Sequence, residues 1–404
     1  MLSRMLVYGQ KIFGLFDELD NLKDNRQKPE IPGHVFPKAI LILWLCRLPS
    51  LNALDQFRTQ SSLRRFLRHA MPSGDQVANV SEVMDVPGLR GILGKMHHRL
   101  IRNKVLLPVR GHRLAVVDGH EINCSYRRCC PECLQRKITV NKEERIQYYH
   151  RAVIFQLVGP SCFCLLDFEL LSPGEDEGTA AIRLIKRVLE QYPRSFDILL
   201  GDGLYPQARL LKLLRQHGKH VIVVLKDERR DLLKDARSLF LTTPTCTYRE
   251  NAVDYQCWDV ENLESWDSYD DKVRVVRSIE TATVRKKKDR KQTKCEQTVE
   301  WVWLTTLPTS EVPTKNIICF GHERWRIENE GFNELCNLWN ADHYFHHHPV
   351  SLVAFWLVLF IAHTLFHCFM RNLKPAIRQG RTCLYWAWRI MADFVSNTWT
   401  FSTA

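Results

Sequence analysis

The stretch that decides the fold reads LAVVDGHE and occupies residues 114–121. An apolar run that ends on Asp118 and continues into glycine predicts a buried strand that delivers a carboxylate to its carboxyl-terminal edge and then turns. The same construction recurs in ILLGDG, residues 198–203, where the acid is Asp202. Asp-Gly alone is ordinary turn chemistry, so it is the repetition that predicts two carboxylates at one edge of a sheet.

Helical spacing singles out a third acid in ERWRIENEGFNEL, residues 323–335. On a wheel of 100° per residue Glu328 shares one arc with large apolar side chains, whereas the other three glutamates fall opposite. A carboxylate on an inward apolar stripe needs a partner, a proton or a metal. An ion pair with Arg324 is the simpler explanation, and a metal ligand beside the two aspartates is the functional one. The apolar arc consists of Trp325, Phe332, Leu335 and Trp339.

Three carboxylates at one sheet edge form a hard-oxygen site that suits Mg²⁺ or Mn²⁺. Two such ions can activate water or a 3′-hydroxyl and stabilise the leaving oxygen of a phosphodiester. The chain of 404 residues carries a formal net charge of +12, which favours a polyanionic partner. The sequence therefore predicts a metal-dependent site that acts on nucleic acid.

Four regions follow from the hydrophobic patterns. Residues 1–105 have helical spacing, with helices expected at 37–48, 51–69 and 80–103, and their basic faces suit either DNA-end binding or plain solvation. Residues 106–238 show strands in a run and then alternate strand and helix, with an amphipathic helix expected at 177–191 and a strand at 220–225, which predicts an α/β mixed sheet. Residues 239–318 alternate like an antiparallel β insertion, and residues 319–404 are helical.

A basic segment at residues 285–294 lies between two strands of the insertion and holds seven Lys or Arg residues against one Asp. A solvated loop and a contact with a phosphate backbone are equally good explanations. The candidate DNA contacts are Arg285, Lys286, Lys287, Lys288, Arg290 and Lys291.

Fourteen cysteines are too dilute in a chain of this length for a disulfide scaffold, and no secretory signal opens the sequence. We therefore expect a reduced, cytoplasmic protein. Cys130 and Cys133 have zinc-knuckle spacing, and Cys124, Cys129 and His150 could complete four ligands of a closed structural Zn²⁺ site. Free cysteines with incidental spacing are an equal alternative.

Three further segments have simpler explanations. The acids at 175–177 open a helix, which favours capping over a metal role for Asp176 or Glu177. The triple histidine 346–348 indicates a polar corner before Pro349. The apolar segment 350–369 is long enough to cross a membrane, but His363 and His367 within it favour a buried core helix.

The acids and their surroundings resemble the DDE insertion-sequence transposases. The resemblance rests on Asp118-Gly119, on Asp202 followed by GLY, and on RWRIE ending at Glu328. It extends from about residue 114 to 339. In the subgroup with a Tyr, Arg, Glu and Lys signature, Arg324 and Glu328 occupy the Arg and Glu places. Gly321 stands where Tyr is expected and Leu335 where Lys is expected.

This resemblance implies an RNase H-like core with a β insertion before the catalytic glutamate. It implies cut-and-paste transposition by a dimer that binds terminal inverted repeats, cleaves a strand and joins the 3′-hydroxyl to target DNA. Asp118, Asp202 and Glu328 would hold two Mg²⁺ or Mn²⁺ ions, and Arg324 and Arg326 would contact DNA. Trp301 and Trp303 are candidates to stack on a flipped base, although packing in the core explains each more simply. The alternative is a non-catalytic DNA-binding protein derived from such an element.

Overall fold

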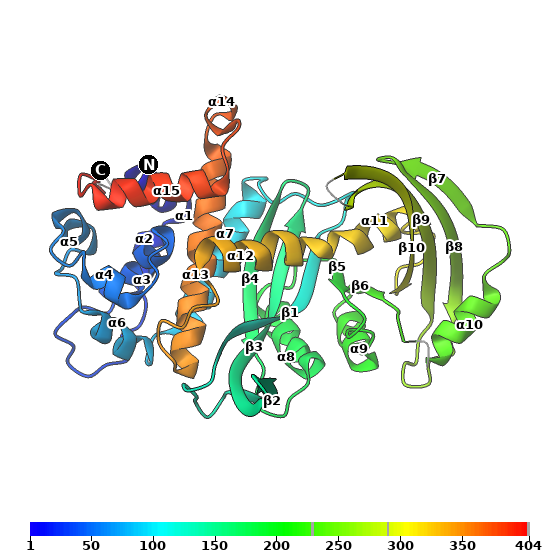
Figure 1. Cartoon of the computed structure of the whole chain (residues 1–404), viewed down its shortest axis with the longest axis horizontal. Helices are drawn as coiled ribbons and strands as arrows, with labels where there is room; N and C mark the ends of the chain where they lie inside the picture. Colours follow the sequence, from blue (N-terminus) through cyan, green and yellow to red (C-terminus); the bar gives the residue numbers. More distant parts are fainter. Residues whose placement is uncertain (228–229, 289–290, 402–404) are drawn as a thin grey trace.

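Five strands form the centre of the molecule, in the order β4-β3-β1-β5-β6 (Figure 1). The computed structural model describes residues 1–227, 230–288 and 291–401, with the side chains of 123, 286–288 and 291–293 excepted. β1, β3 and β4 pair antiparallel, whereas β5 runs parallel to β1 and β6 parallel to β5. The strands are β1 Leu114–Ser125, β3 Glu143–Gly159, β4 Cys162–Leu170, β5 Ile198–Gly201 and β6 His220–Val224. This is the mixed sheet that the residue patterns predicted, in the RNase H-like topology that the resemblance implied.

Helices cover both faces of the central sheet. α8 (Glu177–Gln191) and α9 (Ala208–Gln216) connect the parallel strands and pack on one face. α11 (Thr314–Glu323), the π-helical segment η1 (Ile327–Phe332) and α12 (Asn333–Trp339) follow the insertion and cross the opposite face. The apolar stripe predicted for residues 177–191 is buried against β3 and β4, and the bounds of α8 match the prediction.

β1 does not end at Asp118, which corrects the expectation of a turn at Gly119. Its parallel pairing with β5 stops at Val116, opposite Leu200, but its antiparallel pairing with β3 continues to Ser125. The long β3 supplies hydrogen-bond partners beyond the point where β5 stops, so the backbone stays extended. Asp118 nevertheless lies where the neighbouring parallel strand ends, which is the edge that the sequence indicated.

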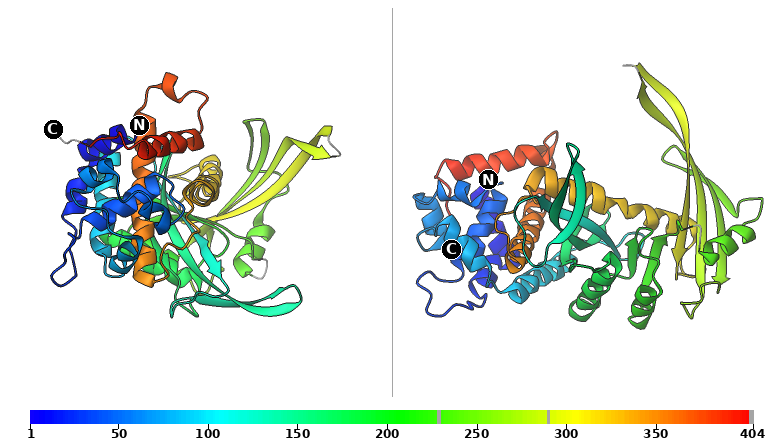
Figure 2. Two further views of the ribbon diagram at one scale, coloured as in Figure 1. Left: turned by 60° about the vertical axis from the view of Figure 1, so that its left-hand side comes forward. Right: turned by 60° about the horizontal axis from the view of Figure 1, so that its bottom comes forward.

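The β insertion extends the same sheet. β10 pairs antiparallel with β6, and β9, β8 and β7 follow in order, so that one ten-stranded sheet runs from β2 to β7. The remaining strands are β2 Leu134–Val140, β7 Cys246–Glu250, β8 Val253–Leu263, β9 Val273–Lys288 and β10 Lys291–Thr305. The β9–β10 hairpin projects from the body (Figure 2). Helix α10 (Asp231–Leu239) precedes the insertion.

The helices of both chain ends form one layer beside β4 (Figure 1). At its centre lies α13 (Pro349–Asn372), which packs against α1, α3, α6, α7 and β4. Its most apolar window has a mean hydropathy of 2.1 and is 89% buried inside the protein, so the prediction of a core helix is confirmed. The others are α1 Leu2–Phe13, α2 Leu15–Asp20, α3 Val35–Leu45, α4 Leu51–Asp55, α5 Ser61–Leu67, α6 Gly74–Ser81, α7 Val86–Arg102, α14 Pro375–Arg378 and α15 Cys383–Val395.

The single helix predicted for residues 51–69 is two short helices, α4 and α5. Gln60 between them is extended, and its side-chain amide donates to the carbonyl of Phe394. The backbone N–H and hydroxyl of Ser62 bind Asn397. Because these partners come from the far end of the sequence, local helical spacing could not reveal the break.

Candidate active site

Asp118 and Asp202 approach each other at the end of the parallel strands. Asp118 projects from β1 toward α11, and Asp202 follows directly after β5. Burial, followed by repulsion from Asp202, raises the pKa of Asp118 to about 7, against an opposing attraction from Arg324. Two carboxylates that disfavour each other's charge are typical of a site that accepts a proton or a cation.

Arg324 joins Asp118 to Glu328. Its Nη1 lies 2.7 Å from Oε1 of Glu328 and 3.6 Å from Oδ2 of Asp118. The Arg324 side chain is 6% exposed, whereas that of Glu328 is 47% exposed. The ion pair expected between Arg324 and Glu328 therefore exists, and the same guanidinium holds Glu328 beside the first aspartate.

The helical wheel was wrong about which glutamate is buried. Glu328 points to solvent, and Glu334 lies inside, where its Oε1 is 2.7 Å from Nε2 of His367 and accepts from the indole of Trp339. The reason is the π-helical segment at Ile327–Phe332, which turns less per residue than the 100° assumed. π-Bulges are frequent at functional sites, and this one carries the third acid of the predicted triad.

Glu177 is a fourth acid beside Asp118. Its side chain is 9% exposed, it forms an ion pair of 2.6 Å with Arg151, and it accepts a hydrogen bond of 2.9 Å from the hydroxyl of Tyr205. A Cβ on Gly119 would lie 2.0 Å from Oε2 of Glu177, so the glycine after Asp118 makes room for this carboxylate rather than for a turn.

Glu177 has a larger role in the structure than the sequence indicated. Capping of α8 falls to Asp176, whose Oδ1 accepts from the backbone of Thr179. Burial is the main cause of the raised pKa of both Asp118 and Tyr205, and the negative charge of Glu177 adds to each. In the sequence, a further role for Glu177 could have been inferred from the acidic turn at 175–177, because a helix cap needs only one of its three acids.

Lys226 lies beside the turn that carries Asp202 and next to Trp301 of β10. A Cβ on Gly203, next to Asp202, would contact the stem of Lys226, whose Nζ lies 5.8 Å from the ring centre of Trp301. Lys226 is exposed just past β6 and was not predicted as a site residue. Trp301 is half-buried, whereas Trp303 is 1% exposed in the core, and the two rings stack with centroids 5.6 Å apart.

Trp303 explains why glycine stands at position 321. A Cβ at Gly321 would lie 2.8 Å from Cε3 of the Trp303 ring, which is closer than real side chains approach. The tyrosine expected at this place in one transposase subgroup therefore cannot enter unless Trp303 moves. Glycine in place of tyrosine at position 321 is therefore a consequence of the packing of Trp303 in this chain.

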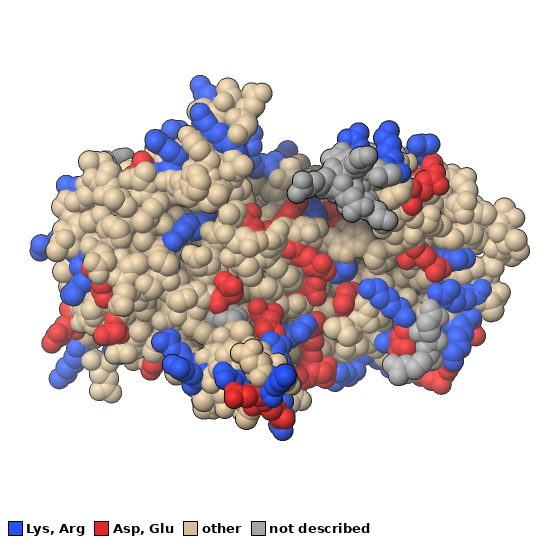
Figure 3. Space-filling view, viewed as in Figure 1, with Lys and Arg blue, Asp and Glu red and all other residues tan. Residues whose placement is uncertain are grey.

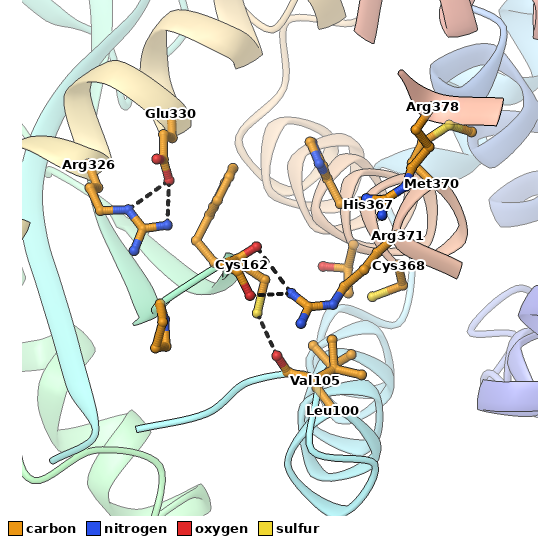
Figure 4. A pocket seen from close by; sticks show the side chains of 14 residues that line it. Leu100, Val105, Cys162, Arg326, Glu330, His367, Cys368, Met370, Arg371 and Arg378 are labelled. Carbon is orange, nitrogen blue, oxygen red and sulfur yellow. Dashed lines mark hydrogen bonds and ion pairs between the residues drawn. The ribbon is translucent and has the colours of Figure 1, made fainter. Parts of the chain in front are cut away.

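Arg326 lies away from the carboxylates. Its guanidinium donates to the carbonyl of Gly159 and pairs with Glu323 and Glu330. It lines a cavity of about 650 Å³ between the β3–β4 turn and α13, together with Arg371 (Figure 4). The structure thus groups Arg324, but not Arg326, with Asp118 and Asp202.

The basic segment is described only in part. Arg285 and Lys294 are exposed on the β9–β10 hairpin. The side chains of Lys286, Lys287, Lys288 and Lys291, and the whole of Arg290, lie outside the described residues. Figure 3 shows acidic side chains across the middle of one face, with Lys and Arg gathered toward the insertion and around α14.

A separate cluster brings Cys130, Cys133 and His150 together as the sequence indicated, but its fourth member is His347. Cys124 and Cys129 are exposed and outside this group, which corrects their place among the expected ligands. The polar corner predicted at 346–348 thus also places His347 beside the two cysteines and His150. In the described part of the chain all cysteines are free thiols.

The five-strand topology and the carboxylates at its parallel edge define an RNase H-like protein. A family model described as "Transposase DDE domain" matches residues 110–365, more than half of the chain, and the chain belongs to this transposase family. Among solved structures it is similar to a piggyBac transposase in a synaptic complex with hairpin DNA, with 12% identity and a TM-score of 0.45. That match covers 98% of this chain and 80% of the other. No curated protein matches the chain.

Proposed function

We propose that this transposase cleaves one DNA strand at each end of a mobile element and joins the freed 3′-hydroxyl to target DNA. The observation that carries the proposal is the raised pKa of Asp118 beside Asp202, with Arg324 holding Glu328 at the same place. Such a cluster of acids is costly in a bare protein and favourable once cations neutralise it.

Asp118, Asp202 and Glu328 are the residues we assign to Mg²⁺ or Mn²⁺, with Glu177 close enough to Asp118 to influence its charge. Oxygen donors on three different elements suit these hard cations. A pair of such ions would supply activation of water or a 3′-hydroxyl and stabilisation of the leaving oxygen.

The other side chains position the acids. Arg324 orients Glu328 and Asp118 toward each other, because its buried guanidinium contacts both. Arg151 and Tyr205 fix Glu177 from two sides, which holds one more negative charge near Asp118. These contacts hold Glu328 and Glu177 near Asp118 before substrate arrives.

DNA is the partner that the family and the net charge of +12 support. We assign backbone contacts to Arg285 on the hairpin and to Lys226 beside Asp202, both of which are exposed. Binding of terminal inverted repeats by the helical region 1–105, and a dimer on DNA, belong to the same proposal.

The test is cleavage of a labelled fragment that carries the element's own ends, with Mg²⁺ or Mn²⁺. Glu328→Gln, Asp118→Asn and Asp202→Asn should each slow cleavage by about 10³-fold, because loss of a ligand removes several kcal/mol of transition-state stabilisation. DNA binding should remain, and the matched control Glu330→Gln should cleave like wild type.

Metal-dependent nicking that survives in Glu328→Gln but fails in Glu330→Gln would overturn the assignment of the third acid. Binding without nicking in the wild type would instead support a non-catalytic DNA-binding protein.

A further inference from the structure

Four metal-ligating side chains converge from three separate segments of the chain. Cys130 and Cys133 lie in the turn before β2, His150 lies on β3, and His347 precedes α13. One ligand atom from each lies within 4.8 Å of the other three. Convergence of soft and borderline ligands from distant segments is the arrangement of a structural metal site rather than of incidental thiols.

The spacing of the ligand atoms fits a tetrahedron. Sγ of Cys130 lies 3.6 Å from Sγ of Cys133 and 3.4 Å from Nε2 of His150. Sγ of Cys133 lies 3.5 Å from Nε2 of His150 and 3.1 Å from Nε2 of His347. Ligands at the usual Zn–S and Zn–N distances stand about 3.3–3.8 Å apart. Three of the four distances fall in this range, and the distance from Cys133 to His347 is slightly shorter. The two sulfurs are too far apart for a disulfide, which needs about 2.0 Å.

The surroundings hold the ligands in place. His150 is fully buried and Cys133 is 3% exposed, while Cys130 and His347 are half-buried. The backbone N–H of Cys130 donates to Sγ of Cys133, and the ring of Tyr344 stacks on His347 with centroids 4.4 Å apart. Outer contacts of this kind orient metal ligands.

We propose that Cys130, Cys133, His150 and His347 bind one Zn²⁺ as a closed structural site. On binding, both thiols release their protons to solvent, so two thiolates and two neutral imidazoles give a site with no net charge. A neutral site is the form that tolerates burial. All four positions belong to the protein, so no place is left for a substrate.

The ion would fasten three parts of the protein together. His150 pairs with Ile122 in the sheet, four residues along β1 from Asp118 and roughly 13 Å at the usual rise of a strand. His347 belongs to the segment that links α12 to the core helix α13. The zinc would thus connect β3, the hydrogen-bonded neighbour of the strand that carries Asp118, to the segment that follows η1 and α12.

Metal analysis of the purified full-length chain tests this assignment. The wild type should hold about one zinc per chain, and Cys133→Ser and His347→Asn should each bind zinc at least about tenfold more weakly. The matched controls Cys124→Ser and His346→Asn should keep their zinc, because Cys124 is outside the cluster and His346 faces Glu82.

Retention of zinc in His347→Asn with loss in Cys124→Ser would overturn the assignment of the fourth ligand. A second measurement covers variants that fail to fold: Co²⁺ added to chelator-treated wild type should give the absorption of a tetrahedral site with thiolate ligands. Wild-type protein that holds no zinc and gives no such Co²⁺ spectrum would overturn the site itself. These readouts do not depend on DNA cleavage.

Discussion

Two clusters of ligating side chains are built in opposite ways. One includes Asp118 on β1, and the other includes His150 on β3, which pairs with Ile122 four residues further along β1. At the carboxylates, like charges oppose each other and the third acid is 47% exposed. At the cysteines and histidines, four ligand atoms are already close together and His150 is fully buried. The exposed carboxylate site leaves coordination positions for water and substrate. The Cys/His site, whose four ligands all come from the protein, can only stabilise the fold.

The largest effect should come from Asp118→Asn in a metal chelator. A folded-state pKa raised from 3.8 to about 7 means that the folded protein holds a proton that the unfolded chain has released. Stability therefore falls as pH rises from about 4 to 7. Asparagine removes this loss, so the variant should gain up to about 4 kcal/mol at pH 8 and nothing at pH 4.

Urea unfolding at both pH values measures this change. Cys133→Ser, measured without the chelator, should do the opposite and lose stability at pH 8, because it removes a ligand from the closed cluster. An Asp118→Asn variant less stable than wild type at pH 8 without metal would show that folding does not raise the pKa of Asp118.

The second largest effect is expected for Arg324→Ala. This change should slow cleavage by about 10²-fold, which is the usual effect of removing one preorganised charged group from an active site. Because Arg324 opposes the effect of burial on the pKa of Asp118, its removal should also move the pH–rate profile for cleavage to higher pH. Arg326→Ala is the matched control, since its partners are Glu323, Glu330 and Gly159.

Zinc content provides the folding check for the Arg324 variant, because the Cys/His cluster should be intact if the sheet is. A pH–rate profile that does not shift in Arg324→Ala but shifts in Arg326→Ala would show that Arg324 does not influence the charge of Asp118.

A smaller effect is expected from Gly321→Ala, which places a methyl group against the ring of Trp303. Overpacking of this kind costs about 1–3 kcal/mol, and it should shift α11 and with it Arg324. Gly203→Ala is the control, because a Cβ there meets Lys226 at 3.5 Å, an ordinary contact. Thermal unfolding and cleavage rate measure both; equal Tm values for the two variants would show that Trp303 can give way.

The smallest effect should follow Lys226→Ala. Because this change removes one positive charge that we assign to the DNA backbone, it should weaken DNA binding by less than about tenfold and reduce the slope of log affinity against log salt by about one. Lys234→Ala, whose ammonium already pairs with Asp231 on α10, should leave the slope unchanged. Fluorescence anisotropy over a salt series measures both variants, and equal slopes would remove Lys226 from the DNA surface.

The sequence predicted what depends on local pattern. Apolar runs located β1, β5 and β6, and the amphipathic stripe located α8, because burial fixes these periodicities. The split of residues 51–69 and the recruitment of His347 depend on partners hundreds of residues away, and a wheel drawn for an α-helix could not show that Glu334 turns inward. The only sign of Glu177 in the sequence was that the turn at 175–177 holds more acids than a helix cap needs.

The π-helical segment also sets the rotation of the helix that follows it. Relative to an unbroken α-helix, one added residue rotates everything that follows by about 100°. Deleting a single residue between Ile327 and Phe332 would therefore turn α12 by that angle and withdraw Glu334 from His367. Deletion or insertion of one residue at this point would rotate the whole surface that α12 presents to α13. The contacts of this helix therefore depend on the number of residues in the π-helical segment as well as on the side chains of α12.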